Sequence, residues 1–270
     1  MMIMKRCLWL AVALAMLAGC ASKDVDEDSE STASGERTAT QMYAEAKAAL
    51  KAQDYETAIQ RLEALEGRFP FGAYAQQAAL DIAYAYYKYD EPESAIAAAD
   101  RFIKLYPRHP RVDYAYYLKG LIKFEQGHSV FDRIGGNDPA KRDPAAARKA
   151  FQFFSELVKR FPKSPYAEDA VQRMVYLRNN LARHELMVAE FYMKRRAYVA
   201  AANRASYIVE NLQRTPSVER ALVIMARAYT ELRLPELAED AVRILQLNFP
   251  DNPSLAEFEP GEATTPNDES

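Results

Sequence analysis

The chain has 270 residues, of which 49% are hydrophobic and 27% are charged, and its formal net charge is −3. This length suits one large domain or two small ones, and the lack of an overall positive charge argues against a general nucleic-acid binder. The sequence has only 2 cysteines and 3 histidines, which excludes a disulfide framework unless the two cysteines pair and leaves little material for metal or acid–base chemistry.

The N-terminus has the pattern of a lipoprotein signal peptide. The basic pair Lys5-Arg6 precedes an apolar run of twelve residues at 7–18, whereas a bilayer-spanning helix would need roughly 20. The run ends in LAGC at 17–20, which resembles a bacterial lipobox and predicts removal of residues 1–19 and attachment of lipid, palmitate included, to Cys20. The position after the cysteine lacks the aspartate that retains such proteins in the inner membrane, which implies an outer-membrane anchor on the periplasmic face. The alternative is a plain signal peptide with a chance cysteine.

Two acidic segments flank the central part of the chain. Residues 20–39 are polar and acidic without any aromatic residue, and residues 251–270 contain six acids and no Lys or Arg. Such segments cannot bury a hydrophobic core. We therefore expect a disordered tether at 20–39, a folded domain at 40–250 and a disordered acidic tail at 251–270.

Four stretches repeat one pattern, in which an alanine is followed twelve residues later by a proline with an aromatic residue directly before it. The pairs are Ala58 and Pro70, Ala95 and Pro107, Ala150 and Pro162, and Ala238 and Pro250. Further small residues stand at positions 46, 83, 120, 189 and 226. Positions 46, 83 and 120 follow one another at intervals of 37 residues, and positions 189 and 226 are also 37 residues apart. Small residues let helices pack closely, and proline ends a helix. We therefore expect an all-α solenoid of five helix pairs that resembles the tetratricopeptide (TPR) repeat, whose usual period is about 34.

The third and fourth units depart from this pattern. In unit three, Gly120 and Ala150 are 30 residues apart, and the extra residues at Gln126–Pro144 are rich in Gly, Asp and Pro. This composition predicts a long loop. In unit four, neither Gly nor Pro occurs between Pro165 and Pro216, so this unit should contain unusually long helices.

The stretch from Tyr166 to about Arg195 is accordingly predicted to be one long first helix, with the second helix of unit four starting near Ala197. A short break near Arg183-His184 is the alternative. The spacing from alanine to proline is fifteen residues in this unit instead of twelve, which predicts that its second helix is about one turn longer than the others.

The sequence contains no motif that points to catalysis or cofactor binding. It lacks the glycine-rich phosphate-binding patterns GxGxxG and GxxxxGK[ST]. His184-Glu185 begins an HExxH zinc motif, but Val188 takes the place of the second histidine. We therefore expect no enzyme, no cofactor and no metal site. A hydrolase that uses His184 and Glu185 is the remaining catalytic alternative.

In a stacked array of helix pairs, the first helix of each unit lines the concave surface. Counted from the small residue of each unit, this inner face is aromatic in units one to three, and the same spacing places Leu80 and Val223 on it. Aromatic side chains give a large contact area with a polar tip, so we expect a groove for an extended or turned peptide with aromatic residues and a carboxylate. Its residues are Tyr43, Lys47, Tyr84, Tyr87, Tyr114, Tyr117 and Phe124. The alternative is that these tyrosines only pack helices together.

Arginines replace the aromatic residues in units four and five. Because arginine pairs bidentately with carboxylates and is favoured at interfaces, we expect a docking surface for a partner protein in these units. Its residues are Arg183, Arg195, Arg196, Arg204 and Arg220. The alternative is a solvated charged face.

Longer stretches resemble the BamD family of outer-membrane protein assembly factors. They are RDP at 142–144 with ARKAF at 147–151, RFPKSPY at 160–166, LA at 181–182 with VAEFY at 188–192, and AYVA at 197–200 with NR at 203–204. The resemblance covers the whole chain after the signal peptide. The long loop and the long helix make it more specific than the repeat motif alone.

The resemblance implies a non-enzymatic, lipid-anchored subunit of the β-barrel assembly machine. Such a protein docks on the periplasmic POTRA domains of the barrel subunit BamA and contacts other lipoproteins of the machine. It also receives unfolded outer-membrane proteins through C-terminal segments that end in an aromatic residue. The alternative is a TPR lipoprotein that assists secretin assembly or coordinates cell-wall enzymes.

Overall fold

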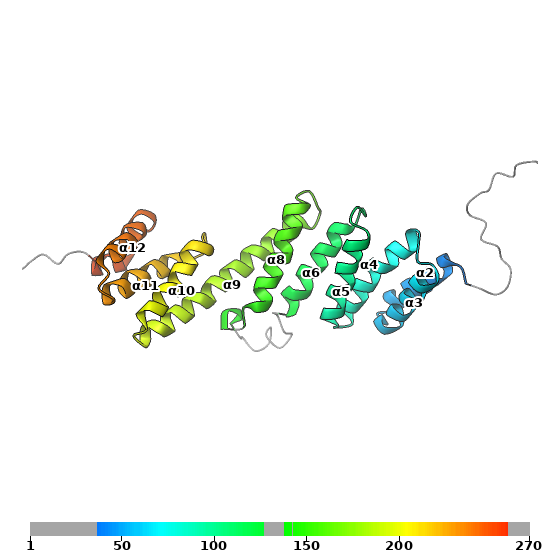
Figure 1. Cartoon of the computed structure of the whole chain (residues 1–270), viewed down its shortest axis with the longest axis horizontal. Coiled ribbons are helices and arrows are strands. Elements are labelled where there is room, and N and C mark those ends of the chain that lie inside the picture. Colours follow the sequence, from blue (N-terminus) through cyan, green and yellow to red (C-terminus); the bar gives the residue numbers. More distant parts are fainter. Residues whose placement is uncertain (1–36, 127–137, 142, 259–270) are drawn as a thin grey trace, which may run out of the picture.

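The computed structural model describes residues 37–126, 138–141 and 143–258, and within these ranges the chain is helical, without strands. The elements are α2 (Ala39–Lys51), α3 (Tyr55–Arg68), α4 (Ala73–Lys88), α5 (Pro92–Leu105), α6 (Val112–Gln126), η1 (Pro139–Lys141), α8 (Ala145–Arg160), α9 (Ala167–Lys194), α10 (Tyr198–Asn211), α11 (Ser217–Glu231), α12 (Pro235–Asn248) and η2 (Pro253–Glu257). They form an elongated row from α2 and α3 at one end to α12 at the other (Figure 1). None of the described helices is long and apolar enough to cross a membrane.

Five helix pairs make up this row. They are α2–α3, α4–α5, α6–α8, α9–α10 and α11–α12, and successive α-helices pack against each other from α2 to α12. This arrangement confirms the predicted all-α solenoid of TPR-like units.

The small residues of the repeat lie where helices approach most closely. The alanines are completely buried at positions 46, 83, 189 and 226 of the first helices and at positions 58, 95, 150 and 201 of the second helices. Gly120 of α6 is the extreme case, because a Cβ atom added there would lie 2.4 Å from the ring of Phe154. The repeat therefore keeps small side chains where a larger one would push two helices apart.

Replacing Gly120 with alanine should destabilise the domain, because the new Cβ would clash with the ring of Phe154, which is fully buried and cannot turn out into solvent. Overpacking costs roughly 1–3 kcal/mol, and alanine recovers about 1 kcal/mol of helix propensity relative to glycine. We expect a net loss of about 1 kcal/mol, seen by circular dichroism as a melting temperature lower by a few degrees. Gly67→Ala is the matched control, since no atom lies within 4 Å of a Cβ added there. Equal shifts for the two variants would contradict the clash.

The first helix of unit four, α9, is a single helix of 28 residues. The predicted long helix is therefore confirmed, and the break considered near Arg183-His184 is wrong, since both residues are helical. Its first half packs in the core of units two and three through Ala170 and Leu177, and its second half packs in the core of units four and five through Ala189. One helix thus belongs to two parts of the solenoid.

The second helix of unit four is not longer than the others, which corrects the prediction. Helix α10 has 14 residues, like α3, α5 and α12. The additional residues form the segment 212–216, where the buried hydroxyl of Thr215 donates to the carbonyl oxygen of Leu212 at 2.8 Å. Arg214 has a left-handed backbone conformation with φ of 60°. A folded turn therefore takes up the extra spacing.

The folded region also extends further at both ends than expected. At the N-terminal end, Thr38 and Gln41 form a capping box, so that α2 begins at Ala39. At the C-terminal end, residues from 251 onward were expected to be disordered, but η2 forms there because Asn252 caps it and its side chain donates to Glu219 at 2.7 Å. Cys20, most of the tether, most of the unit-three loop and the rest of the acidic tail lie outside the described residues.

Candidate functional site

The aromatic residues predicted to line a groove come from the first helices of units one to three. Tyr84 and Tyr87 of α4 and Tyr114 of α6 pack against one apolar cluster, and the rings of Tyr114 and Tyr166 are 5.4 Å apart. Each of the seven predicted groove residues keeps part of its side chain accessible. The structure therefore brings aromatic residues of neighbouring units together on one surface. We call the seven predicted residues the aromatic groove, and the hollow shape that this name implies stays a prediction.

Asp81 joins the first two units within this groove. It is 6% exposed, and it accepts hydrogen bonds from the Tyr43 hydroxyl at 2.8 Å, from Lys47 Nζ at 3.1 Å and from Gln77 Nε2 at 3.0 Å. Burial and the bond to Asp81 raise the pKa of Tyr43 far above its usual range, so this hydroxyl remains a donor. Sequence reasoning missed Asp81, although a single acid in the apolar stretch 78–85 was a usable signal.

Tyr84 and Tyr87 form the next part of the groove, with ring centroids 6.4 Å apart. The Tyr87 hydroxyl donates to Glu125 of α6 at 2.7 Å, and burial together with this bond raises the pKa of Tyr87. Two cations lie over the rings: Lys88 Nζ is 5.4 Å from the centroid of Tyr87, and the Arg111 guanidinium is 5.4 Å from that of Tyr114. Neither cation has a carboxylate partner within the described chain, so both are available to an anionic ligand.

The third part of the groove lies between α6 and the first half of α9. Tyr117 stacks on Tyr166 with centroids 4.8 Å apart, and its hydroxyl donates to Asp169 at 2.6 Å. Burial and this bond raise the pKa of Tyr117 to about 12. Arg173 donates to the same carboxylate and lies 4.7 Å from the ring centroid of Phe124. The groove therefore ends in a network that ties α6 to α9.

Residues from the first half of α9 were missed by sequence reasoning. The repeat was aligned on Ala189 in the second half of this helix, which left the first half without an assigned face. The spacing of the residues at 166, 169, 173 and 176 places them on one side of a helix, and this pattern could have found them.

Leu80 and Val223 do not line the groove, which corrects another part of the prediction. They are 0% and 1% exposed and pack inside two hydrophobic clusters. Tyr43 and Tyr117 hold the same repeat position, but a tyrosine is long enough to carry its hydroxyl to the surface, whereas leucine and valine end in the core.

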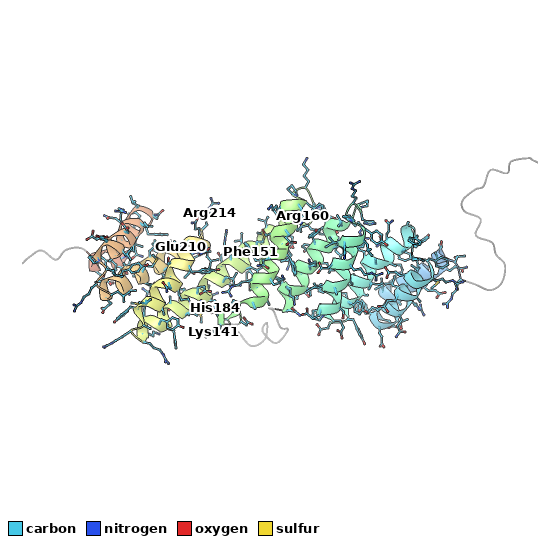
Figure 2. All side chains as sticks on the ribbon, viewed as in Figure 1. Lys141, Phe151, Arg160, His184, Glu210 and Arg214 are labelled. Atoms are coloured by element: carbon cyan, nitrogen blue, oxygen red, sulfur yellow. The ribbon has the colours of Figure 1, made fainter. Side chains whose placement is uncertain are left out.

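Glu185 is the centre of a buried ion triad. It is 2% exposed and accepts from Arg148 Nη2 of α8 at 2.7 Å and from Arg204 Nη1 of α10 at 3.0 Å. The neighbouring His184 has its Nδ1 2.8 Å from the carbonyl oxygen of Ala140, which holds η1 against α9; His184 and Lys141 of η1 lie on the same edge of the molecule (Figure 2). Both residues of the hydrolase alternative therefore have structural contacts.

Two more of the predicted docking arginines also have partners within the chain. Arg183 donates to Asp138 at 2.6 Å, and Arg220 donates to Glu190 at 3.3 Å. Together with Arg204 in the triad, three of the five arginines bind different carboxylates. The structure therefore does not join the five into one patch.

The other two, Arg195 and Arg196, lie at the turn between α9 and α10 and are exposed. The Arg195 guanidinium is 4.4 Å from the ring centroid of Phe191, which is 49% exposed, and Val199 is 60% exposed at the start of α10. Exposed aromatic, aliphatic and arginine side chains in one place are typical of protein interfaces. We call these four residues the α9–α10 turn surface.

Comparison with known proteins gives the family. The family described as YfiO, outer membrane lipoprotein, matches residues 35–244. The chain is 47% identical over 248 residues to outer membrane protein assembly factor BamD of Neisseria meningitidis serogroup B (strain MC58), covering 91% of this chain and 92% of that one. The chain belongs to the BamD family. It is also 39% identical to BamD of Vibrio cholerae and 36% identical to BamD of Haemophilus influenzae, over 88% of its length in each case.

Membership of the BamD family confirms the resemblance found in the sequence. The matched range begins just before α2 and ends within α12, so it includes the aromatic groove, the ion triad and the α9–α10 turn surface. The family consists of outer-membrane lipoproteins, in agreement with the predicted association with that membrane.

Proposed function

We propose that this chain is a non-enzymatic, lipid-anchored subunit of the outer-membrane protein assembly machinery. In this proposal it docks on BamA through its C-terminal units and receives unfolded outer-membrane proteins in its aromatic groove. Family membership and the lipobox at Cys20 support the membrane setting. The aromatic groove is the observation that carries the receiving role.

The groove matches the chemistry of a peptide that ends in an aromatic residue with a free carboxylate. The hydroxyls of Tyr43, Tyr87 and Tyr117 are held by carboxylates of the neighbouring unit, so the rings are held in place, and each keeps part of its surface accessible. Aromatic side chains of a ligand can pack on such rings. Lys88 and Arg111 can bind the terminal carboxylate without giving up an existing ion pair.

Docking on BamA fits the α9–α10 turn surface better than the other predicted arginines. Arg183, Arg204 and Arg220 would have to leave a carboxylate within the chain to bind a partner. Arg195 and Arg196 would not have to break an ion pair within the described chain to bind a partner. Phe191 and Val199 beside them add exposed apolar area.

The test is recovery of BamA with the solubilised protein after Arg195 and Arg196 are both changed to glutamate. Charge reversal at an interface costs several kcal/mol when it opposes a like charge, so we expect BamA recovery to fall at least tenfold. The matched control is Lys104→Glu with Arg108→Glu, two exposed cations near the end of α5, which should leave recovery unchanged.

Fractionation of the same cells tests the anchor. Both reversal variants should remain in the outer-membrane fraction. Cys20→Ser combined with the Arg195 and Arg196 reversals, which also removes docking on BamA, should leave that fraction, because stable anchoring needs the acyl chains. Full BamA recovery by the Arg195 and Arg196 variant would refute docking at this surface. Recovery of a secretin or of a cell-wall enzyme in place of BamA would favour the alternative function.

A further inference from the structure

The second helix of each unit carries an apolar stripe, which the next unit covers wherever one follows. In units one to four the stripe consists of an alanine and the apolar residues four and seven positions later, and all of them are 0% exposed. These residues are Ala58, Leu62, Leu65, Ala95, Ala99, Phe102, Ala150, Phe154, Leu157, Ala201, Ala205 and Ile208. In every one of these units, buried residues of the helix that follows in the chain share a hydrophobic cluster with the stripe.

The matching stripe of unit five is only partly covered. Leu245 is buried, with Leu255 of η2 packed against its cluster, but Ala238 is 8% exposed and Val242 is half-buried. No α-helix follows α12 within the described residues. We call the uncovered stretch around Ala238 and Val242 the terminal seam.

The short helix η2 stands where a sixth unit would begin. Arg227 of α11 makes a bidentate ion pair with Glu257, with Nε 2.9 Å and Nη2 2.6 Å from the two carboxylate oxygens. Ion pairs such as Arg220 with Glu190 link the first helices of successive units in the same way. Because η2 has only 5 residues, it makes this contact and leaves the rest of the seam open.

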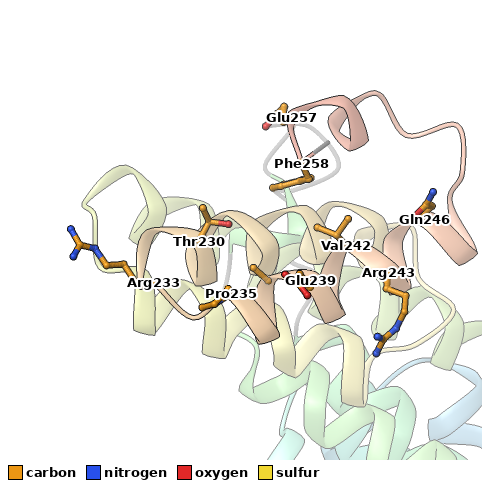
Figure 3. A pocket seen from close by; sticks show the side chains of 10 residues that line it. Thr230, Arg233, Pro235, Glu239, Val242, Arg243, Gln246, Glu257 and Phe258 are labelled. Carbon is orange, nitrogen blue, oxygen red and sulfur yellow. The ribbon is translucent and has the colours of Figure 1, made fainter. Parts of the chain in front are cut away.

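The open part is a cavity of about 490 Å³ between α12 and the end of η2. Pro235, Ala238 and Val242 of α12 form its apolar side, and Phe258 lies across from them, above Thr230 and Val242 (Figure 3). This volume is large enough for several side chains of a bound segment.

Charged residues border the apolar part of the cavity. Arg233, Glu239, Arg243 and Glu257 all line it. Arg243 and Glu257 are paired within the chain, whereas Arg233 and Glu239 have no ion-pair partner among the described residues. An apolar centre with a polar rim is the usual anatomy of a binding surface. A segment that fits it would carry small apolar residues in its centre and one charge of each sign beside them.

Two occupants from this chain are disfavoured. Residues 259–270 contain no Val, Ile, Leu, Met or aromatic residue, so they have no side chain to fill the apolar cavity. A second copy stacked head to tail would place α2 on the seam. In α4, Ala78 and Ile82 make the seam contact, but 37 positions earlier α2 has Gln41 and Glu45.

We propose that the terminal seam is a docking site for an amphipathic helix of a partner protein. The helix would take the place that the first helix of the next unit takes in units one to four, with Phe258 at its side. This site is separate from the aromatic groove and from the α9–α10 turn surface, and it does not depend on the role proposed for either of them.

The probe is a fluorescent, helix-stapled peptide with the sequence of residues 217–231, since α11 itself covers the equivalent stripe of unit four. Fluorescence anisotropy with the full-length solubilised protein should show saturable binding. Val242→Asp and, without a charge, Val242→Gln should each weaken it at least tenfold. Leu247→Asp is the matched control, because Leu247 is on the same helix, is 77% exposed and lies outside the cavity.

Circular dichroism and melting temperature establish that the three variants remain folded. A peptide with Ile224→Asp should not bind, because in the protein Ile224 of α11 packs against the stripe of unit four. Absence of saturable binding to the unaltered protein would overturn the proposal, as would equal affinity of the Val242 and Leu247 variants. Sedimentation is measured in parallel. If the unaltered protein forms dimers and Val242→Asp dissociates them, the seam binds a second copy of this chain. That result would overturn the proposal of a partner helix.

Discussion

Replacing both arginines that flank Glu185 with alanine should destabilise the domain more than removing the charge of Glu185 itself. Arg148→Ala with Arg204→Ala leaves a carboxylate that is 2% exposed without a cation, which costs roughly 3–5 kcal/mol when a buried pair is broken. Glu185→Gln leaves two arginines whose side chains are 46% and 47% exposed and can turn to water. We expect that variant to lose about 1.5–3 kcal/mol, the value of a hydrogen bond to a charged group.

Urea unfolding followed by circular dichroism measures both variants. Arg183→Ala is the control, because Asp138, which it leaves unpaired, is itself 27% exposed, and the loss should be within about 1 kcal/mol. If Glu185→Gln proves as damaging as the double arginine variant, burial of the carboxylate does not control the energetics. The triad also means that Arg204→Glu would place two carboxylates together, so a loss of partner binding in that variant would report on the fold.

Changing Tyr84 and Tyr87 together to alanine should weaken binding of a peptide that ends in an aromatic residue and a free carboxylate. Loss of two aromatic contacts in the centre of an interface costs about 2–4 kcal/mol, which is roughly a 30- to 1,000-fold rise in Kd. Isothermal titration with a synthetic ten-residue C-terminal peptide of an outer-membrane protein provides the measurement.

The matched control is Tyr86→Ala with Tyr89→Ala. These two tyrosines are on or next to the same helix, but their hydroxyls donate to Glu63 and Glu56 of α3 instead of lining the groove. Peptide affinity should be unchanged in this control. An amidated peptide should bind more weakly than the acid if Lys88 and Arg111 hold the carboxylate. Unchanged affinity in the folded Tyr84 and Tyr87 variant would remove the groove as the peptide site.

The helix pairs were predictable from sequence because their causes are local. A small residue at a fixed distance from a proline decides how close two helices lie and where the second one ends, and this held for Ala58, Ala95 and Ala150. The same rule gave the wrong length for α10, because fifteen residues can be accommodated by an extra helical turn or by a folded turn. The buried hydroxyl of Thr215 favours the folded turn, and its partner could not be read from spacing alone.

The groove was predictable only in part because its contacts join neighbouring units. Tyr43 and Tyr117 were found from their repeat positions, but the carboxylates that hold them, Asp81 and Asp169, lie 38 and 52 residues further along the chain. Which residues face each other across such distances depends on how the units are rotated relative to one another. Sequence periodicity within a unit carries no information about that rotation.

The unbroken helix α9 has a mechanical consequence. At 1.5 Å per residue, its 28 residues form a rod about 42 Å long, one end of which is bonded to Tyr117 while the other carries Arg195. A loop at its midpoint would let the two ends move independently. A continuous helix is stiff, so a tilt at one end also moves the other end. A load applied at the α9–α10 turn would therefore be felt as a displacement of Asp169 and Arg173, at the far end of the groove.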